Sequence, residues 1–372
     1  MFDPFKRTRR KAAKRLQRTA VSAINDAWGS ALAPAKPAKR KAAKKAGTSA
    51  SSRKTVRKSK DAKPAAKSKP LTTSRLEITV PRGATFTDGT YNSAEGARSY
   101  KIYIPVIARK AEKPVPLIVM LHGCGQTPDD FARGTGMNAL AEEFGFLVLY
   151  PAQSRHAHLN RCWNWFKRED QARALGEPAI IAGLTRQVIA TQNIDPAKIY
   201  VAGLSAGASA AMIVATAYPD IFAAVGVHSG LPAGAAHDAG SASRAMQIGN
   251  PGNRHEAPVP TIIFHGDADK VVNPRNSRFI TIRALEPFSG LTTTERKGRI
   301  ADGREFTRLL HRVGKGRPYV EQWIVHGTGH AWSGGHPTGS YTDPAGPDAS
   351  HEMVRFFLKH RTTKKKRAQF GS

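Results

Sequence analysis

The chain is poor in cysteine, poor in acidic residues and without long apolar runs. Its two cysteines, Cys124 and Cys162, are too few for a disulfide-rich scaffold or a cysteine-based zinc domain. No stretch of about 18 apolar residues occurs, so no transmembrane helix is predicted. Residues 1–33 also lack the apolar core of about 7–15 residues that a secretory signal peptide needs. From the sequence as written we therefore expect a cytoplasmic protein.

Acidic residues are scarcest at the two ends of the chain. The formal net charge is +30, and residues 1–70 hold 22 lysines and arginines against 3 acidic residues. Residues 359–372 hold 6 basic residues and no acidic ones, which leaves the middle at only +5. A basic arm attracts DNA, RNA and anionic lipid without reading a base sequence. We expect residues 1–70 to bind polyanions non-specifically, if at all.

Composition divides the chain into four segments. Residues 1–33 combine apolar side chains at helical spacing with a basic face, which predicts an amphipathic basic helix. Such a helix can lie on an interface, bind a partner or pack on its own domain. Residues 34–74 are rich in lysine, alanine and proline and predict a disordered linker. Residues 75–360 are expected to form the catalytic domain, and residues 361–372 a basic disordered tail.

Short apolar strands alternate with helices from about residue 75 onward. This alternation predicts an α/β fold with a mostly parallel central sheet and helices on both faces. The first two predicted strands are expected to form an antiparallel hairpin at one edge. The predicted strands are 76–80, 99–106, 117–122, 146–150, 199–203, 223–228, 261–265 and 322–326, and the predicted helices include 129–144, 178–191, 206–218, 276–285 and 348–359.

The segment 203–207, Gly-Leu-Ser-Ala-Gly, lies between a predicted strand and a predicted helix. A serine on such a sharp turn projects its hydroxyl into a cleft, and the flanking glycines allow the close approach of backbone to backbone. Ser205 is therefore the candidate nucleophile. A serine needs a base and an acid partner, which follow it in the order Ser, Asp, His in α/β-hydrolases.

Both partners are available downstream of Ser205. Asp269 follows the strand 261–265 in a His-Gly-x-x-Asp-x-x-Val pattern and is favoured as the acid over Asp267, which is expected to shape the turn. His330 lies in a glycine-rich loop after the last predicted strand and is the candidate base. The other histidines considered are expected to be structural at strand ends or exposed in a loop: His228, His265, His326 and His336.

Hydrolysis of an ester also needs donors for the negative oxygen of the intermediate. The backbone N–H of Ala206, directly after the nucleophile, is expected to be one donor. The other is expected from the loop 121–127, where Gly123 lets the chain turn inward and Cys124 supplies the amide. The histidines lack metal-ligand spacing, so neither a metal nor a cofactor is predicted.

Five motifs in this order resemble the poly(3-hydroxybutyrate) depolymerase family of esterases, which also holds feruloyl and acetylxylan esterases. The resemblance covers about residues 75–360. It implies an α/β-hydrolase fold and a serine esterase with catalytic Ser205, Asp269 and His330. The motifs are His-Gly-Cys-Gly-Gln (122–126), Cys-Trp-Asn-Trp-Phe (162–166), Gly-Leu-Ser-Ala-Gly (203–207), His-Gly-Asp-Ala-Asp (265–269) and Gly-His-Ala-Trp-Ser-Gly-Gly (329–335).

The resemblance also implies a Cys124–Cys162 disulfide, against which a cytoplasmic location argues because disulfides persist in oxidising compartments. It makes the tryptophan-rich loop a substrate-contact region, with Trp163 and Trp165 as contacts; Trp332, two residues beyond the candidate base, is a further one. Phe166 is expected to pack in the core.

Three functions are compatible with these residues. The first is a cytoplasmic, granule-associated esterase acting on poly(3-hydroxybutyrate) or its oligomers. The second is a feruloyl or acetylxylan esterase, whose substrates lie outside the cell. The resemblance also makes an extracellular location, as for many members of the family, the alternative to the cytoplasmic one. The third is a granule-coating or nucleoid-tethering protein that acts through its basic arm.

Overall fold

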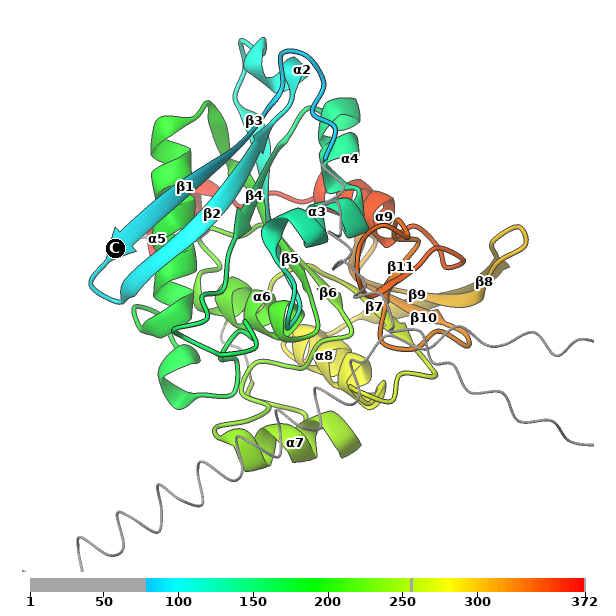
Figure 1. Cartoon of the computed structure of the whole chain (residues 1–372). Helices are drawn as coiled ribbons and strands as arrows, with labels where there is room; N and C mark the ends of the chain where they lie inside the picture. Colours follow the sequence, from blue (N-terminus) through cyan, green and yellow to red (C-terminus); the bar gives the residue numbers. More distant parts are fainter. Residues whose placement is uncertain (1–77, 255–256, 371–372) are drawn as a thin grey trace, which may run out of the picture.

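The structure, a computed structural model, describes residues 78–254 and 257–370 (Figure 1). The predicted helix 1–33 and linker 34–74 lie outside the described residues, so the role of the basic arm stays a prediction. The strands are β1 (Thr85–Ser93), β2 (Gly96–Ile104), β3 (Val115–Leu121), β4 (Leu147–Pro151), β5 (Ile194–Leu204), β6 (Ala224–His228), β7 (Thr261–Gly266), β8 (Leu291–Arg299), β9 (Glu305–Val313), β10 (Pro318–Val325), β11 (Trp332–Ser333) and β12 (Thr342–Asp343).

The described strands form a ten-stranded sheet in the order β1-β2-β4-β3-β5-β6-β7-β10-β9-β8, and β11 pairs with β12 separately. The six central strands, β4 to β10 in this order, are parallel, whereas β1, β2, β9 and β8 add antiparallel pairs at the two edges. This is the mostly parallel sheet of an α/β-hydrolase. The carboxyl ends of the parallel strands lie together at one end of the sheet, which is where binding sites of open α/β sheets form.

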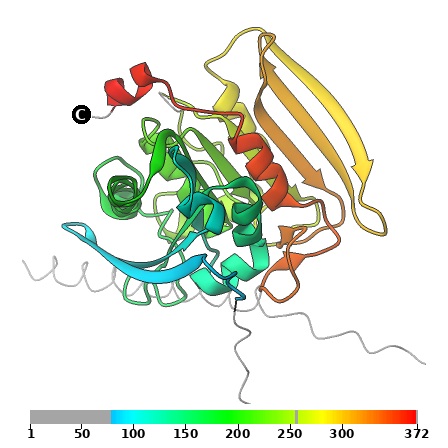
Figure 2. The same ribbon diagram turned by 90° about the horizontal axis from the view of Figure 1, so that it is seen from above.

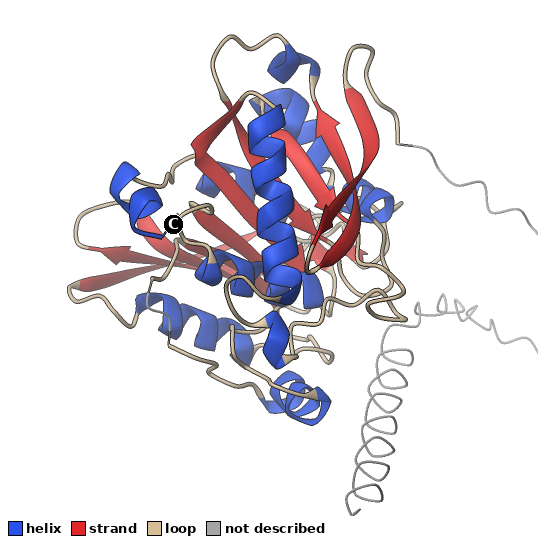
Figure 3. Cartoon of the chain, turned by 90° about the vertical axis from the view of Figure 1, so that its left-hand side faces the viewer, coloured by secondary structure: helices blue, strands red, loops and turns tan. Residues whose placement is uncertain are grey.

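Helices cover both faces of the sheet, and Figure 3 shows the long helix α5 crossing in front of the strands. Helices α5, α6 and α8 pack on one face, and α3, α4 and α9 on the other. The helices are α2 (Val106–Arg109), α3 (Pro128–Thr135), α4 (Met137–Phe144), η1 (Arg168–Asp170), α5 (Gly176–Thr191), α6 (Ala206–Ala217), α7 (Ala239–Ile248), α8 (Arg275–Leu285), α9 (Ala349–Phe357) and α10 (Lys364–Phe370).

Alternate residues of each central strand enter different cores because side chains of a strand point to opposite faces. In β5, Ile199 and Val201 belong to the core under α6, while Tyr200 and Ala202 belong to the core under α9. A sheet covered on both faces needs such continuous apolar strands. These strands were therefore readable from the sequence.

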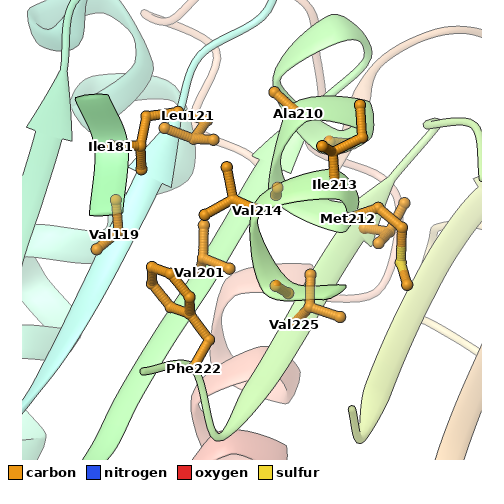
Figure 4. Packing of buried hydrophobic residues seen from close by; sticks show 14 of the residues in the cluster. Val119, Leu121, Ile181, Val201, Ala210, Met212, Ile213, Val214, Phe222 and Val225 are labelled. Atoms are coloured by element: carbon orange, nitrogen blue, oxygen red, sulfur yellow. The ribbon is translucent and has the colours of Figure 1, made fainter. Parts of the chain in front are cut away.

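Helix α6 is apolar around its whole circumference, with small residues and no charge. A helix of this composition is stable only when it is buried on all sides. Figure 4 shows Met212, Ile213 and Val214 packed over Val201 and Val225 of the two strands beneath. The helix that follows Ser205 is thus fixed in the interior of the domain.

Two edge elements differ from the sequence prediction. The segment 76–80 was predicted as the first strand, but residues 78–80 are not a strand, and the hairpin is formed by β1 and β2 instead. Gly89 interrupts the apolar pattern of β1, where the ring of Tyr100 covers it; a Cβ there would lie 2.3 Å from that ring. The antiparallel pair β8 and β9 was also missed, because β8 is polar and almost wholly exposed. Figure 2 shows this yellow and orange hairpin beside the helices.

Two helical predictions also need correction. The predicted helix 129–144 is two helices, because Gly136 adopts φ 63° between α3 and α4 and ends the first one. The tail 361–372 was expected to be disordered, but α10 lies within it. Lysine, arginine, alanine and glutamine are good helix formers, which accounts for a helix despite the charge. None of the described helices has the length and apolarity needed to cross a bilayer.

Candidate active site

The predicted catalytic residues follow three parallel strands that end at the same edge of the sheet. Ser205 follows β5, Asp269 follows β7 by three residues, and His330 follows β10 by five residues. The strand ends are in register, since Leu204 pairs with His228 in β6, and Val325 of β10 pairs with Gly266 of β7. Parallel pairing therefore brings together residues that are far apart in the sequence.

Ser205 occupies a backbone conformation that non-glycine residues rarely adopt, with φ 58° and ψ −120°. Its amide donates a hydrogen bond of 2.9 Å to the carbonyl of His228, which holds the turn against β6. The strain places the side chain at the end of β5 as α6 begins. This is the geometry expected of a nucleophile on a strand-to-helix turn.

The flanking glycines are required by close backbone approach. A Cβ on Gly203 would lie 2.4 Å from the carbonyl of Gly207, and a Cβ on Gly207 would lie 2.1 Å from the carbonyl oxygen of Leu121. Neither neighbour can move, because both belong to the backbone of packed elements. The expectation of crowding at both positions is confirmed.

Asp269 and His330 form a buried pair. The Oδ2 of Asp269 lies 2.8 Å from Nδ1 of His330, and its Oδ1 accepts from the amides of Val271 and Val272 at 2.8 and 2.9 Å. Burial alone would raise the pKa of the Asp269 carboxyl, but the charge of His330 and hydrogen bonds from His265 and His330 lower it well below its usual range. The carboxylate is therefore charged when it orients the imidazole.

His330 and Ser205 line the same small cavity. The Nε2 of His330 is buried and has no hydrogen-bond partner among the described residues. The cavity measures ≈ 10 Å³, space for about one water-sized group. Its lining residues are Gly123, Cys124, Leu204, Ser205, His330 and Tyr341.

The alternative acid and base are engaged elsewhere. Asp267 accepts from Nδ1 of His326 at 2.7 Å and from the Gly327 amide at 2.7 Å, so it shapes the turn as expected. The other nitrogen of His326 lies 2.9 Å from the Thr307 hydroxyl. His228 is buried, and its Nε2 accepts from the Ser333 amide, so it cannot take a proton without losing this bond.

A buried glutamine that sequence reasoning passed over fixes the loop carrying Cys124. Gln126 accepts the Gly123 amide at 2.8 Å and donates to Asp130 and to the backbone of Ser340, each at 3.1 Å. It thus ties the loop after β3 to the loop that carries Tyr341. Gln126 belongs to the His-Gly-Cys-Gly-Gln motif of residues 122–126, but only its contacts in the structure identify this role.

The structure joins Cys124 and Cys162 in a disulfide that links the loop after β3 to the tryptophan-rich loop. A hydrogen bond of 2.7 Å from the Gly125 amide to Asn160 runs beside it. Closing a loop of this length contributes roughly 3–4 kcal/mol in the chain-entropy model. Cys124 lines the cavity beside Ser205, and its amide donates to no backbone carbonyl within residues 78–254 and 257–370. Ala206 opens α6, where a first-turn amide has no partner inside the helix.

The predicted substrate contacts of Trp163, Trp165 and Trp332 need correction, because all three indoles are buried. Trp163 donates to the carbonyl of His122 and Trp332 donates to the Ser350 hydroxyl, both at 3.0 Å. Their bulk fills the core behind the site and leaves no surface for a substrate. Sequence reasoning missed Tyr341 instead, whose loop carries no recognisable motif.

Trp165 belongs to the same interior, with its ring edge against Phe166. Trp332 stacks on His228 at 5.0 Å, directly behind the carbonyl that holds Ser205. The tryptophans therefore support the site from behind rather than line it.

Residues 98–306, more than half of the chain, match the family described as "Esterase PHB depolymerase". The chain belongs to this family. Over 229 residues it is 33% identical to "Poly(3-hydroxyalkanoate) depolymerase C" of Paucimonas lemoignei, covering 58% of this chain and 54% of that protein. The chain thus spans about half the length of that relative.

Two further esterases are similar to this chain over longer stretches. "Feruloyl esterase B" of Talaromyces funiculosus is 26% identical over 265 residues, covering 64% of this chain and 71% of that protein. Among solved structures, "Acetyl xylan esterase from Aspergillus awamori" aligns with a TM-score of 0.52 at 20% identity, covering 66% of this chain and 94% of the other. The structural match supports the α/β-hydrolase fold alone.

The tryptophan-rich loop is anchored by two buried carboxyl groups. Glu177 accepts from the backbone and side chain of Asn164 at 2.7 and 2.8 Å, and its own amide donates to Asp170 at 2.7 Å. Burial and the nearby Glu177 raise the pKa of Asp170 to about 6. Asp170 therefore keeps a proton in the folded protein at a pH where it is ionised in the unfolded chain.

This difference predicts a pH dependence of stability. Because the folded pKa lies above the unfolded value, the contribution of Asp170 is fully present below about pH 4 and is lost progressively as the pH rises from there through about 6. Between pH 5 and 7.5 the loss should be roughly 1 kcal/mol. Urea unfolding at both pH values should show this loss in the native chain and a smaller one in Asp170→Asn. Equal losses would contradict the shift.

Proposed function

We propose that this chain is a serine esterase with Ser205 as nucleophile, His330 as base and Asp269 as orienting acid. One observation carries the proposal: the free Nε2 of His330 and the strained Ser205 share a cavity, while Nδ1 is held by a charged carboxylate. A base needs an available nitrogen and a fixed tautomer. His330 has both.

The geometry supports a two-step reaction. The Ser205 oxygen attacks the ester carbonyl, its proton passes to Nε2 of His330, and the carbonyl oxygen becomes an oxyanion. The amides of Cys124 and Ala206 donate to this oxyanion. The intermediate collapses as His330 protonates the leaving alcohol, and an acyl group stays on Ser205. Water, deprotonated by His330, then attacks the acyl-enzyme carbonyl. As the second intermediate collapses, His330 returns the proton to the Ser205 oxygen and the acid is released.

We infer that the substrate is poly(3-hydroxybutyrate) or its oligomers. The relative named a poly(3-hydroxyalkanoate) depolymerase supports this class. The cavity beside Ser205 admits about one water-sized group, so the acyl and alcohol chains must lie outside it, as an extended polymer chain can. A feruloyl or acetylxylan ester is the second candidate, favoured by the relatives that bear those names.

The disulfide bears on where this reaction takes place. A Cys124–Cys162 bridge is typical of oxidising compartments, so it favours the extracellular alternative over the cytoplasmic, granule-associated one. Granule coating or polyanion binding by residues 1–70 stays a separate hypothesis, since it depends on the arm rather than on this site.

The substrate is tested by incubating the purified chain with amorphous poly(3-hydroxybutyrate) granules and measuring released 3-hydroxybutyrate. Ser205→Ala should abolish release, because no other described residue occupies the strand-to-helix turn. Ser289→Ala, at an exposed position, serves as the matched control and should retain full activity. Serine-dependent cleavage of methyl ferulate without release from granules would move the substrate to plant-derived esters.

The two candidate acids are separated by isosteric substitution. Asp269→Asn should lower kcat for a p-nitrophenyl ester by about 10⁴-fold, because the imidazole loses the partner that holds its tautomer. Asp267→Asn should change kcat by less than about tenfold, since its carboxyl holds only His326 and the Gly327 turn. Comparable losses in the two variants would refute the assignment, provided that both retain their melting temperature.

A further inference from the structure

A second cavity lies at the opposite edge of the sheet from Ser205. It measures ≈ 470 Å³ and is lined by Lys198, Arg317, Leu358, Lys359, His360 and Arg361. Lys198 lies in the first half of β5, and Arg317 directly precedes β10, a strand parallel to β5. Both side chains therefore come from amino-terminal portions of strands whose carboxyl ends carry the catalytic residues. We call this cavity the amino-edge pocket.

The amino-edge pocket holds more cations than carboxylates that pair with them. Four of its six lining residues are permanently basic, and none is acidic. Lys198 lies 3.5 Å from Asp195, but in the described part of the chain no carboxylate forms an ion pair with Arg317, Lys359 or Arg361. Unpaired like charges around one cavity repel each other, which destabilises the free protein. A bound anion would relieve this repulsion.

The ends of three separate elements meet at this cavity. The carbonyl of His360 accepts from the Tyr200 hydroxyl at 2.8 Å, which fixes the chain after α9 against β5. The His360 ring packs on Phe356 at 4.4 Å and is 7% exposed. Burial, together with the nearby charges of Arg317 and Lys359, lowers the pKa of His360 to about 4. The imidazole is thus uncharged at neutral pH and forms part of the pocket floor.

The helix dipole explains only part of this arrangement. The carboxyl end of α9 favours a cation in or just after its last turn, which accounts for Lys359. It does not account for Lys198 or Arg317, which come from other elements. Basic residues also continue beyond the pocket as Lys364, Lys365 and Lys366 in α10.

We propose that the amino-edge pocket binds a small anion carrying several phosphate groups, with a linear oligophosphate as the best match. Arginine pairs with phosphate through two parallel N–H donors, and lysine contributes point charges. One phosphate engages one or two cations, so four cations suit a chain of about three phosphates. The site is independent of ester hydrolysis, because Ser205 lies at the other edge of the sheet.

The proposal is tested on the full chain with inorganic tripolyphosphate at fixed ionic strength. A ligand that binds only the folded state raises the melting temperature, whereas a ligand that binds the folded and unfolded states equally does not. We expect a rise of at least about 3 °C at saturating tripolyphosphate. Lysine acetylation followed by mass spectrometry should show at least threefold protection of Lys198 and Lys359.

Matched variants separate the pocket from general charge. Arg317→Gln/Lys359→Gln should lose the thermal shift, while Lys110→Gln/Arg278→Gln, which removes the same charge at exposed positions elsewhere, should keep it. Orthophosphate and sulfate at the same ionic strength should shift the melting temperature by less than a third as much. Equal shifts in the two double variants, equal shifts with sulfate, or no protection of either lysine would overturn the proposal.

The same variants identify the source of the phosphates. A short single-stranded oligonucleotide that reproduces the shift and the protection would place the phosphates in a nucleic-acid backbone, and the binding chemistry would stand. If the oligonucleotide fails where tripolyphosphate succeeds, the pocket takes a free oligophosphate. Ester hydrolysis by the pocket variant should equal that of the native chain, so failure of this proposal is distinguishable from failure of the esterase assignment.

Discussion

The parallel pairing of β3, β5, β6, β7 and β10 is the constraint on which the rest of the structure depends. Leu121 pairs with Gly203, Leu204 with His228, and Val325 with Gly266. The four loops that carry Cys124, Ser205, Asp269 and His330 therefore start from the same end of the sheet. A shift of one residue in any of these pairs would turn alternate side chains to the wrong face and displace the loop that follows.

Most of the side chains that surround these loops hold the loops in place and do not face a cleft. The disulfide, the buried Gln126 and the indole of Trp163 all fix the loop after β3, which carries the Cys124 amide. On the other side, Trp332 and His228 back the turn of Ser205. Donors held in place before the reaction stabilise developing charge most effectively.

Much of this arrangement could be predicted from sequence, because apolar strands and short motifs leave local patterns. The strand–Ser205–helix segment, the aspartate past β7 and the histidine past β10 each carried such a pattern. The burial of the tryptophans could not be predicted, because the sequence around an aromatic residue is the same whether its side chain lines a cleft or packs in the core. Trp332 was therefore predicted to contact substrate, although its indole is buried. The polar strand β8 has no apolar face at all and is visible only through its pairing with β9. The amino-edge pocket likewise joins residues from three elements with no shared motif.

The central claim is that Ser205, on the turn between β5 and α6, is the activated nucleophile. The most direct measurement is labelling of the full chain with a fluorophosphonate, which forms a covalent adduct only with an activated serine, followed by peptide mapping. The account predicts one adduct, on Ser205, with labelling slowed at least about 10³-fold in His330→Ala because the base is lost. An adduct on another serine, or labelling of Ser205 at an unchanged rate in His330→Ala, would contradict it.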